Sequence, residues 1–224
     1  MLKKFDQLPD FMKNKEVEKY HKILSKKKFD LILKRIFDII VSIILLIPFI
    51  LILIPIAIFI WLEDKGPIFY NSNRLGKNGK IFKMYKFRSM KVNAPDIRNK
   101  DGSTFNSDND QRLTKIGKII RKTSVDELPQ ILNVLKGDMS IVGPRPDLPE
   151  DIYSYKKGEM IRLIVLPGIT GYSQAYYRNS IIAAKKIKND CYYVKNFSIW
   201  FDVKIIIQTI KSVLKRDNIF QKNN

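Results

Sequence analysis

The sequence predicts a mixed α/β fold that is mainly helical and carries a re-entrant membrane helix. Three observations predict it: one long apolar run, two strand-like segments joined through Asn78-Gly79, and basic amphipathic stretches toward both ends of the chain. A chain of 224 residues has room for one small globular domain and its attachments. The expected parts are an amphipathic N-terminal extension (residues 1–33), a re-entrant helix-break-helix membrane segment (34–63), a globular α/β domain with a β-hairpin (64–196), an interfacial amphipathic helix on the membrane surface (197–216) and a tail (217–224).

Residues 39–62 form the membrane segment, because they are apolar apart from Ser42 and include two prolines, Pro48 and Pro55. A straight helix of this length would reach about 36 Å, more than the roughly 30 Å of a bilayer's hydrocarbon core. Clusters of Lys and Arg flank the run on both sides, and such residues prefer the cytoplasmic side of a membrane. A segment that enters and returns keeps both clusters there. We therefore predict a re-entrant helix broken near Pro48; a kinked transmembrane helix is the alternative.

The charge balance points to an anionic partner. Lys and Arg outnumber Asp and Glu by 41 to 22, and the formal net charge is +19. Phosphate-bearing substrates, anionic lipid headgroups and nucleic acid all fit this charge, and the membrane segment favours the first two. Aromatic residues between the lysines of residues 80–88 keep nucleic acid as the next alternative at this point.

The chain has one cysteine, Cys191, and one histidine, His21. These counts exclude an internal disulfide, a zinc site built from cysteines and a site with several histidine ligands. His21 lies in a lysine-rich stretch, where we expect a solvated surface side chain. The chemistry must therefore rest on carboxylates, Lys, Arg or hydroxyl groups.

Two segments have the apolar spacing of amphipathic helices. Residues 1–30 carry apolar side chains among many lysines, which fits an interfacial or partner-binding helix, or a solvated helix with modest packing. Residues 196–216 place Trp200 and several aliphatic residues on one face and mostly basic and polar residues on the other. That apolar face suits either the headgroup layer of a membrane or the core of the domain.

Residues 67–70 and 80–85 predict the two strands of a hairpin. The connection contains Asn78-Gly79, a dipeptide that accepts the positive φ angles of a tight turn.

The adjacent carboxylates Asp126 and Glu127 lie at the start of a predicted helix. Pro129 locates that start, because proline is tolerated in the first helical turn, and Gly137 marks the end. The N-terminal end of a helix favours ionised carboxylates and also attracts phosphate. A structural role is the alternative, since Ser124 and Glu127 match the spacing of a capping box.

Arg145 lies between Pro144 and Pro146, which restrict the backbone on both sides. Because this backbone is already restricted, little conformational entropy is lost when the guanidinium binds a ligand, and its planar form suits bidentate phosphate binding. A plain rigid turn is the alternative. Residues 167–171, Pro-Gly-Ile-Thr-Gly, form a turn-prone loop that could bring its backbone close to a ligand.

Together these features resemble the monotopic bacterial phosphoglycosyl transferases, which initiate surface-glycan pathways. The likeness covers about residues 33–216. The chain departs from the family where Ile47 precedes Pro48 in place of a serine, and where Leu166 replaces a common arginine. The motifs that carry the likeness are Lys34-Arg-Ile-Phe-Asp38, the membrane run, Asn73-Arg-Leu-Gly76, Tyr85-Lys-Phe87, Asp126-Glu127, residues 135–146, residues 167–171 and Tyr192-Tyr-Val-Lys-Asn196.

The resemblance implies an enzyme of the bacterial cytoplasmic (inner) membrane, with residues 64–196 as a catalytic domain on the cytoplasmic face. It implies transfer of a sugar-1-phosphate from a UDP-sugar donor to polyprenyl (undecaprenyl) phosphate, with release of UMP. Asp126 would be the nucleophile that forms a covalent phospho-sugar intermediate, and Asp126 and Glu127 would hold Mg²⁺. The positions that match basic residues around the phosphates in the family are Lys86, Arg121, Arg145 and Arg178.

A non-catalytic basic scaffold on the membrane surface is the competing hypothesis. Its helices would recruit anionic partners without chemistry, and anionic membrane lipids are expected partners under both hypotheses. Nucleic acid is not an expected partner, because it gives no reason for a proline-broken apolar run or for the pairing of Asp126-Glu127 with a proline-flanked Arg145.

Overall fold

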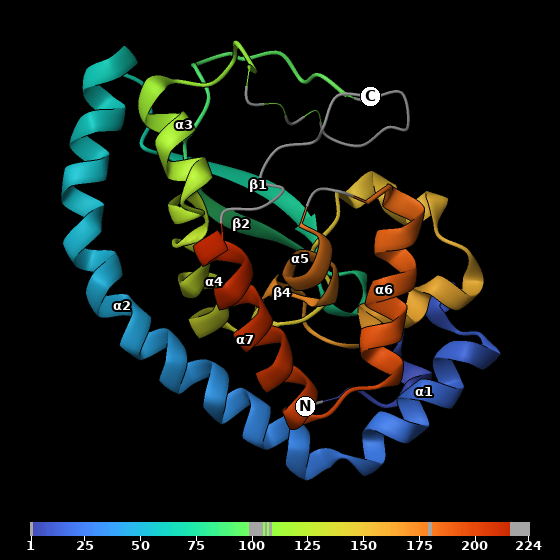
Figure 1. The fold of residues 1–224 in the computed structure, drawn as a ribbon. Coiled ribbons are helices and arrows are strands. Elements are labelled where there is room, and N and C mark those ends of the chain that lie inside the picture. The colour runs from blue at the N-terminus through green and yellow to red at the C-terminus, as the bar shows by residue number, and fades with distance from the viewer. Residues whose placement is uncertain (1, 99–104, 106, 108, 179–180, 216–224) are drawn as a thin grey trace.

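The computed structural model describes residues 2–98, 105, 107, 109–178 and 181–215. In Figure 1 the long helix α2 runs along one side, with α3 and α4 between it and the β1–β2 hairpin; α7 lies in front of the middle of the domain, and α6 lies on the side away from α2. The strands of the described residues form two small sheets, β1–β2 and β3–β4. The helices are α1 (Lys15–Lys26), α2 (Lys28–Asp64), α3 (Lys115–Lys122), α4 (Gln130–Lys136), α5 (Tyr172–Tyr177), α6 (Ala183–Lys195) and α7 (Ile199–Lys215). The strands are β1 (Phe69–Leu75), β2 (Ile81–Phe87), β3 (Ser140–Val142) and β4 (Gly168–Thr170).

The predicted hairpin is confirmed. β1 and β2 pair antiparallel over their full lengths, so that β1 extends to Leu75, past the predicted end at residue 70. The connection takes positive φ angles at Asn78 (58°) and Gly79 (73°), as the dipeptide predicted.

Helix α2 continues through both prolines, so the structure does not confirm the predicted break at Pro48. Pro48 and Pro55 lie inside the helix, which bends around the globular domain in Figure 1. A proline removes one hydrogen bond of the helix and pushes against the preceding turn, and a bend accommodates both effects without ending the helix. Re-entry into a membrane stays a prediction.

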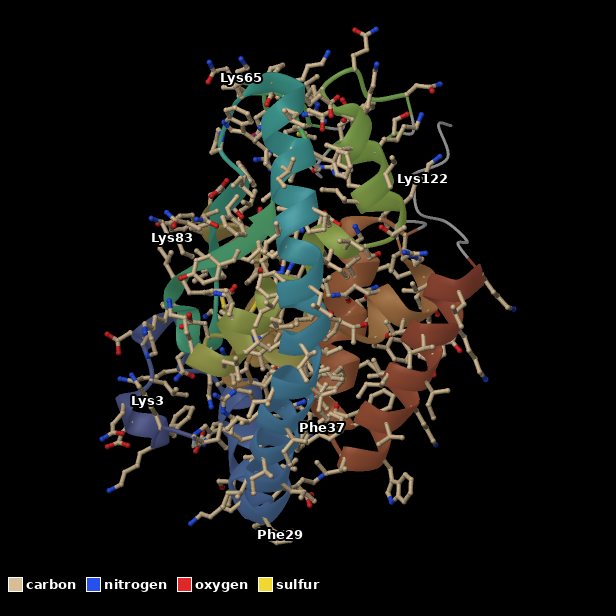
Figure 2. The ribbon with its side chains drawn as sticks, turned by 90° about the vertical axis from the view of Figure 1, so that its left-hand side faces the viewer. Lys3, Phe29, Phe37, Lys65, Lys83 and Lys122 are labelled. Carbon is tan, nitrogen blue, oxygen red and sulfur yellow. The ribbon has the colours of Figure 1, made fainter. Side chains whose placement is uncertain are left out.

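One face of α2 packs against the domain and the other is exposed. Phe49, Ile56 and Ile60 are buried in a cluster with apolar side chains of β2, α3 and α4. By length and composition α2 could cross a membrane. Figure 2 shows the helix lying against the domain between Phe29 and Lys65. The exposed aliphatic side chains of its middle part include Ile40, Ile43, Ile44, Ile47, Ile50, Leu51, Ile54 and Ile58.

The N-terminal end of α2 is joined to the domain by buried polar contacts. Lys34 Nζ lies 2.6 Å from Asp202 Oδ2 of α7 and 2.9 Å from the carbonyl oxygen of Val142, at the end of β3. Asp38 Oδ1 accepts a hydrogen bond of 2.9 Å from the amide of Ile141 in the same strand. These contacts fix β3, and the chain that follows it, relative to α2.

The C-terminal end of α2 is joined to the same domain. Arg88, which follows β2, donates to both carboxylate oxygens of Asp64, at 2.5 and 2.6 Å. Glu63 accepts hydrogen bonds from the backbone amides of Lys115 and Ile116, and so satisfies the first turn of α3. Both polar ends of the apolar helix therefore contact one folded unit.

The N-terminal extension packs into the core, which neither predicted alternative described. Met12, Val17 and Leu24 are fully buried, and α1 contacts the 3-10 segment η6 (Lys157–Ile164). The prediction of a solvated His21 is wrong: the side chain is 8% exposed, and Nε2 lies 2.8 Å from the carbonyl oxygen of Lys3. His21 shares the inward face of α1 with Val17 and Leu24, since the spacing of these residues places them on one side of a helix.

Helix α7 turns most of its predicted apolar stripe outward. Ile205 is buried, whereas Trp200, Ile207, Ile210 and Leu214 are exposed. The stripe therefore does not serve mainly to fill the core, and its placement on a membrane surface stays a prediction.

A buried polar cluster lies beside the end of β3. Arg162 of η6 is 4% exposed and donates to the carboxylates of Asp147 and Asp190, which are far apart in sequence. Burial raises the pKa of Asp190 to about 7, against the opposing effect of Arg162. Asp190 is thus a buried acid that titrates near neutral pH.

Replacement of Lys34 by methionine should strongly destabilise the fold. The Asp202 carboxylate would stay buried without its cation, which typically costs about 3–5 kcal/mol. The thermal unfolding midpoint of the full chain in detergent measures the effect, with Lys204→Met, an exposed lysine of α7, as the control. Equal midpoints for the two variants would contradict this role of Lys34.

Asp190→Asn should remove a pH dependence of stability. An aspartate in an unfolded chain ionises near pH 4, whereas folded Asp190 keeps its proton up to about pH 7. Between these values the folded state binds more protons, so the stability of the wild type falls as pH rises. From pH 5 to pH 7 the variant should gain about 2 kcal/mol relative to the wild type. Parallel curves of unfolding midpoint against pH would argue against a raised pKa.

Candidate active site

Asp126 and Glu127 lie in a 3-10 turn, η4 (Val125–Glu127), between α3 and α4. Ser124, just before the turn, has a φ of 58°, and its side chain makes no capping hydrogen bond. The capping box, which was the alternative role for this pair, is therefore not formed. The Glu127 amide donates to the Ser124 carbonyl oxygen (3.3 Å), and the Ser124 hydroxyl accepts from Arg178.

Two cations contact the carboxylate of Glu127. Lys86 Nζ of β2 lies 2.6 Å from Oε1, and Arg145 Nη2, from the loop after β3, lies 3.1 Å from the same oxygen. Burial alone would raise the pKa of Glu127, but Lys86 and Arg145 outweigh it and hold that pKa below its usual range. Glu127 is therefore ionised at neutral pH.

Asp126 is 8% exposed and lies within the field of the same cations. Burial raises its pKa to about 6, the neighbouring Glu127 adds to the shift, and Lys86, Arg121 and Arg145 oppose it. The ionised form of this carboxylate is only weakly hydrated, which suits a nucleophile.

The structure brings together five of the six residues predicted for the site. Arg121, on α3, interacts with both carboxylates through its charge, and its Nε donates to Ser89 Oγ (2.9 Å). Arg178 borders the group from outside, because it donates to Ser124 Oγ (3.3 Å) and to the carbonyl of Ser212 in α7 (3.2 Å). We define the active cluster as Asp126, Glu127, Lys86, Arg121 and Arg145.

Asn133 joins two elements at the active cluster, and the sequence did not predict this role. This residue of α4 is fully buried, accepts a hydrogen bond from the Tyr85 amide (3.0 Å) and donates to the Lys83 carbonyl (2.7 Å). It thereby joins α4, which follows Glu127, to the strand that carries Lys86. The available signal was an asparagine inside an otherwise apolar helical stripe, since a buried amide must find partners.

The glycines of residues 167–171 allow close packing of the chain, and their predicted approach to a ligand stays a prediction. A Cβ atom on Gly168 would lie 2.1 Å from the amide nitrogen of Gly143, and one on Gly171 would lie 2.1 Å from the carbonyl oxygen of Gly143. β4 pairs in parallel with β3, and Gly143 begins the loop that bears Arg145. The three glycines therefore let this loop lie directly on β4.

The active cluster combines two carboxylates with an excess of positive charge. Three cations surround the two carboxylates, and such an excess favours an anionic ligand such as phosphate. Within the described part of the chain, no group of three or more His, Cys, Asp or Glu side chains could hold a metal unaided. The two carboxylates do fit Mg²⁺, which proteins often bind through one or two carboxylates, with substrate phosphates and water completing the shell.

Comparison with known proteins matches the chain to the bacterial sugar transferase family model over residues 29–216. The chain is 40% identical over 208 residues to an undecaprenyl-phosphate galactose phosphotransferase of Salmonella typhimurium, covering 87% of this chain and 43% of that protein. It is 42% identical over 188 residues to a UDP-N-acetylgalactosamine-undecaprenyl-phosphate N-acetylgalactosaminephosphotransferase of Aeromonas hydrophila, covering 81% and 44%. An uncharacterized sugar transferase of Bacillus subtilis, EpsL, is 44% identical over 195 residues, covering 87% and 93%.

The chain thus spans less than half the length of the Salmonella and Aeromonas proteins and nearly all of the Bacillus protein. The family model begins at residue 29, so most of the N-terminal extension that packs into the core lies outside it. The resemblance inferred from the motifs is confirmed, and the chain belongs to the bacterial sugar transferase family.

Proposed function

We propose that this protein transfers a sugar-1-phosphate from a UDP-sugar to polyprenyl (undecaprenyl) phosphate and releases UMP. The observation that carries the proposal is the buried Asp126 carboxylate beside Glu127, within an excess of cationic side chains. The names of the Salmonella and Aeromonas relatives support the same acceptor and the transfer of a sugar phosphate.

Asp126 acts as the nucleophile in the proposed mechanism. Its carboxylate oxygen attacks the phosphorus attached to the sugar, and the bond from that phosphorus to the oxygen shared with the uridine phosphate breaks. UMP leaves with that oxygen, and an aspartyl phospho-sugar remains. A phosphate oxygen of the lipid then attacks the same phosphorus, which frees the Asp126 carboxylate and gives a polyprenyl-diphosphate sugar.

The remaining members of the active cluster bind and neutralise the phosphates. Lys86 and Arg145 already meet at one oxygen of Glu127, so both are placed to donate to an anionic group that enters beside it. Arg121 adds charge from α3, and Arg178 lies at the edge of the cluster. Mg²⁺ held by Asp126 and Glu127 would disperse the charge of the diphosphate when bound.

The contacts of α2 support one part of the re-entrant proposal, that both ends of the segment stay on the same face of the membrane, which we propose is the cytoplasmic face of the bacterial inner membrane. Both polar ends of α2 are hydrogen-bonded to the same domain, and its middle packs on that domain through Phe49, Ile56 and Ile60. A helix that crossed the bilayer would have to give up the contacts at one end. The exposed apolar faces of α2 and α7 would then lie in the lipid, with basic residues at anionic headgroups.

Asp126→Asn should abolish turnover without loss of membrane association. The amide is not a nucleophile, so UMP release should fall at least about 1,000-fold, in line with loss of a covalent step. UDP-galactose, UDP-glucose and UDP-N-acetylgalactosamine, which the names of relatives suggest, are tested with Mg²⁺ in detergent. Asp10→Asn, an exposed carboxylate of the extension, is the control.

Mass spectrometry of the wild type with donor and no acceptor should locate a sugar phosphate on Asp126. Transfer without that adduct would refute the covalent mechanism. Absence of UMP release with every donor, together with salt-dependent vesicle binding, would favour the scaffold hypothesis.

Cysteines introduced at Lys28 and Lys65, in a Cys191→Ala background, should be labelled from the same side of the membrane. Both positions are exposed and flank α2, so a re-entrant segment keeps them together on the cytoplasmic side. An impermeant maleimide applied to right-side-out and inverted vesicles measures this. Labelling from opposite sides would establish a span instead.

A further inference from the structure

We infer that Arg162 is a positioning residue for Arg145, and that it sets the phosphate-binding geometry through the backbone of the loop between them. The inference rests on the proposed function, which assigns Arg145 to the substrate phosphates. Arg162 is distant from Arg145 in the sequence and contacts neither carboxylate of the active cluster in any hydrogen bond described here.

Arg162 contacts the Arg145 loop on both sides of Pro146. Its Nη2 donates to the carbonyl oxygen of Arg145 (3.0 Å), and its Nη1 donates to the carboxylate of Asp147. A proline on each side already restricts the backbone around Arg145. The bond from Arg162 fixes the direction of the carbonyl group between them, and with it the peptide plane that leads out of Arg145.

Other residues, outside the Arg145 loop, fix the guanidinium group of Arg162. Nη2 also donates to Asp190 of α6, and Nη1 also donates to the Tyr155 hydroxyl, which in turn donates to Asp147 (2.6 Å). The side chain is 4% exposed. A rigid planar group with several donors can satisfy acceptors in these different directions, whereas the single ammonium of a lysine cannot reach them together.

The loop backbone sets the point from which the Arg145 side chain extends. That side chain is 45% exposed, and its Nη2 donates to Glu127 Oε1 at 3.1 Å. The direction of the Cα–Cβ bond follows the backbone and limits where the guanidinium can lie. A small rotation of the loop would therefore carry the guanidinium away from the phosphates, and misplacement by about 1 Å can cost about 100-fold in rate.

A double-mutant cycle on ligand affinity tests the inference. All proteins are full-length, in detergent, and keep Asp126; the probe is UDP with Mg²⁺, which has no sugar to transfer, and its binding is measured by calorimetry. Arg162→Lys should raise the Kd about 10-fold when Arg145 is present. In an Arg145→Ala background the same change should raise it less than about 2-fold, because the residue through which it acts is gone.

Arg35→Lys is the matched control. Arg35 also donates to two backbone carbonyls, those of Val134 and Leu135, but it contacts neither Arg145 nor the carboxylates of the active cluster. Its effect on the Kd should be small and equal in both backgrounds. If Arg162→Lys fails to fold, Asp190→Asn takes its place, since it keeps an oxygen acceptor for Arg162 and should raise the Kd about 3-fold only when Arg145 is present.

An equal rise in Kd with and without Arg145 would overturn the inference and leave Arg162 a general structural residue. Absence of UDP binding by the wild type, combined with absence of an adduct on Asp126, would refute the proposed function and the inference together. UDP binding by the wild type with an additive cycle would refute the inference alone.

Discussion

The ammonium group of Lys34 lies where α2, α7 and the end of β3 meet, at hydrogen-bond distance from Asp202 and from the Val142 carbonyl. Buried charges of this kind are tolerated only when they are paired, and separation of the partners costs several kcal/mol. The long helix and the strand therefore cannot shift independently. Because the Arg145 loop begins directly after β3, its position depends on this contact before any substrate is present.

The same loop is fixed from two further directions. β4 lies against Gly143 so closely that side chains on Gly168 or Gly171 would collide with it, and Arg162 holds the carbonyl of Arg145. Asn133 fixes α4 relative to β2 through its hydrogen bonds to the backbone of that strand. Rigid placement of cations before binding lowers the cost of organising charge around a transferring phosphoryl group, which is the main contribution a protein can make to such chemistry.

Helix α2 has one apolar face that packs on the globular domain and a second apolar face that is exposed. Its inner face buries Phe49, Ile56 and Ile60 against β2, α3 and α4, each contributing about 1.5–3 kcal/mol if fully removed from water. Its outer face exposes aliphatic side chains over the whole middle part. In the proposed topology, the helix that lies in lipid also packs directly against the globular domain. The proposed active site would then lie near the lipid headgroups, where the acceptor phosphate is located.

The sequence by itself determined the features that depend on neighbouring residues: the hairpin at Asn78-Gly79, the apolar helix, the end of α4 at Gly137 and the acidic pair Asp126-Glu127. Its motifs also predicted Lys86, Arg121 and Arg145 near the acidic pair, where the structure places them. Only the tertiary structure decided that α2 continues through Pro48, that His21 is buried, and that Arg162 and Asn133 donate to the carbonyls of Arg145 and Lys83. The reason is physical: backbone angles and helical faces follow from local spacing, whereas the partners of a buried polar group come from segments that only folding brings together.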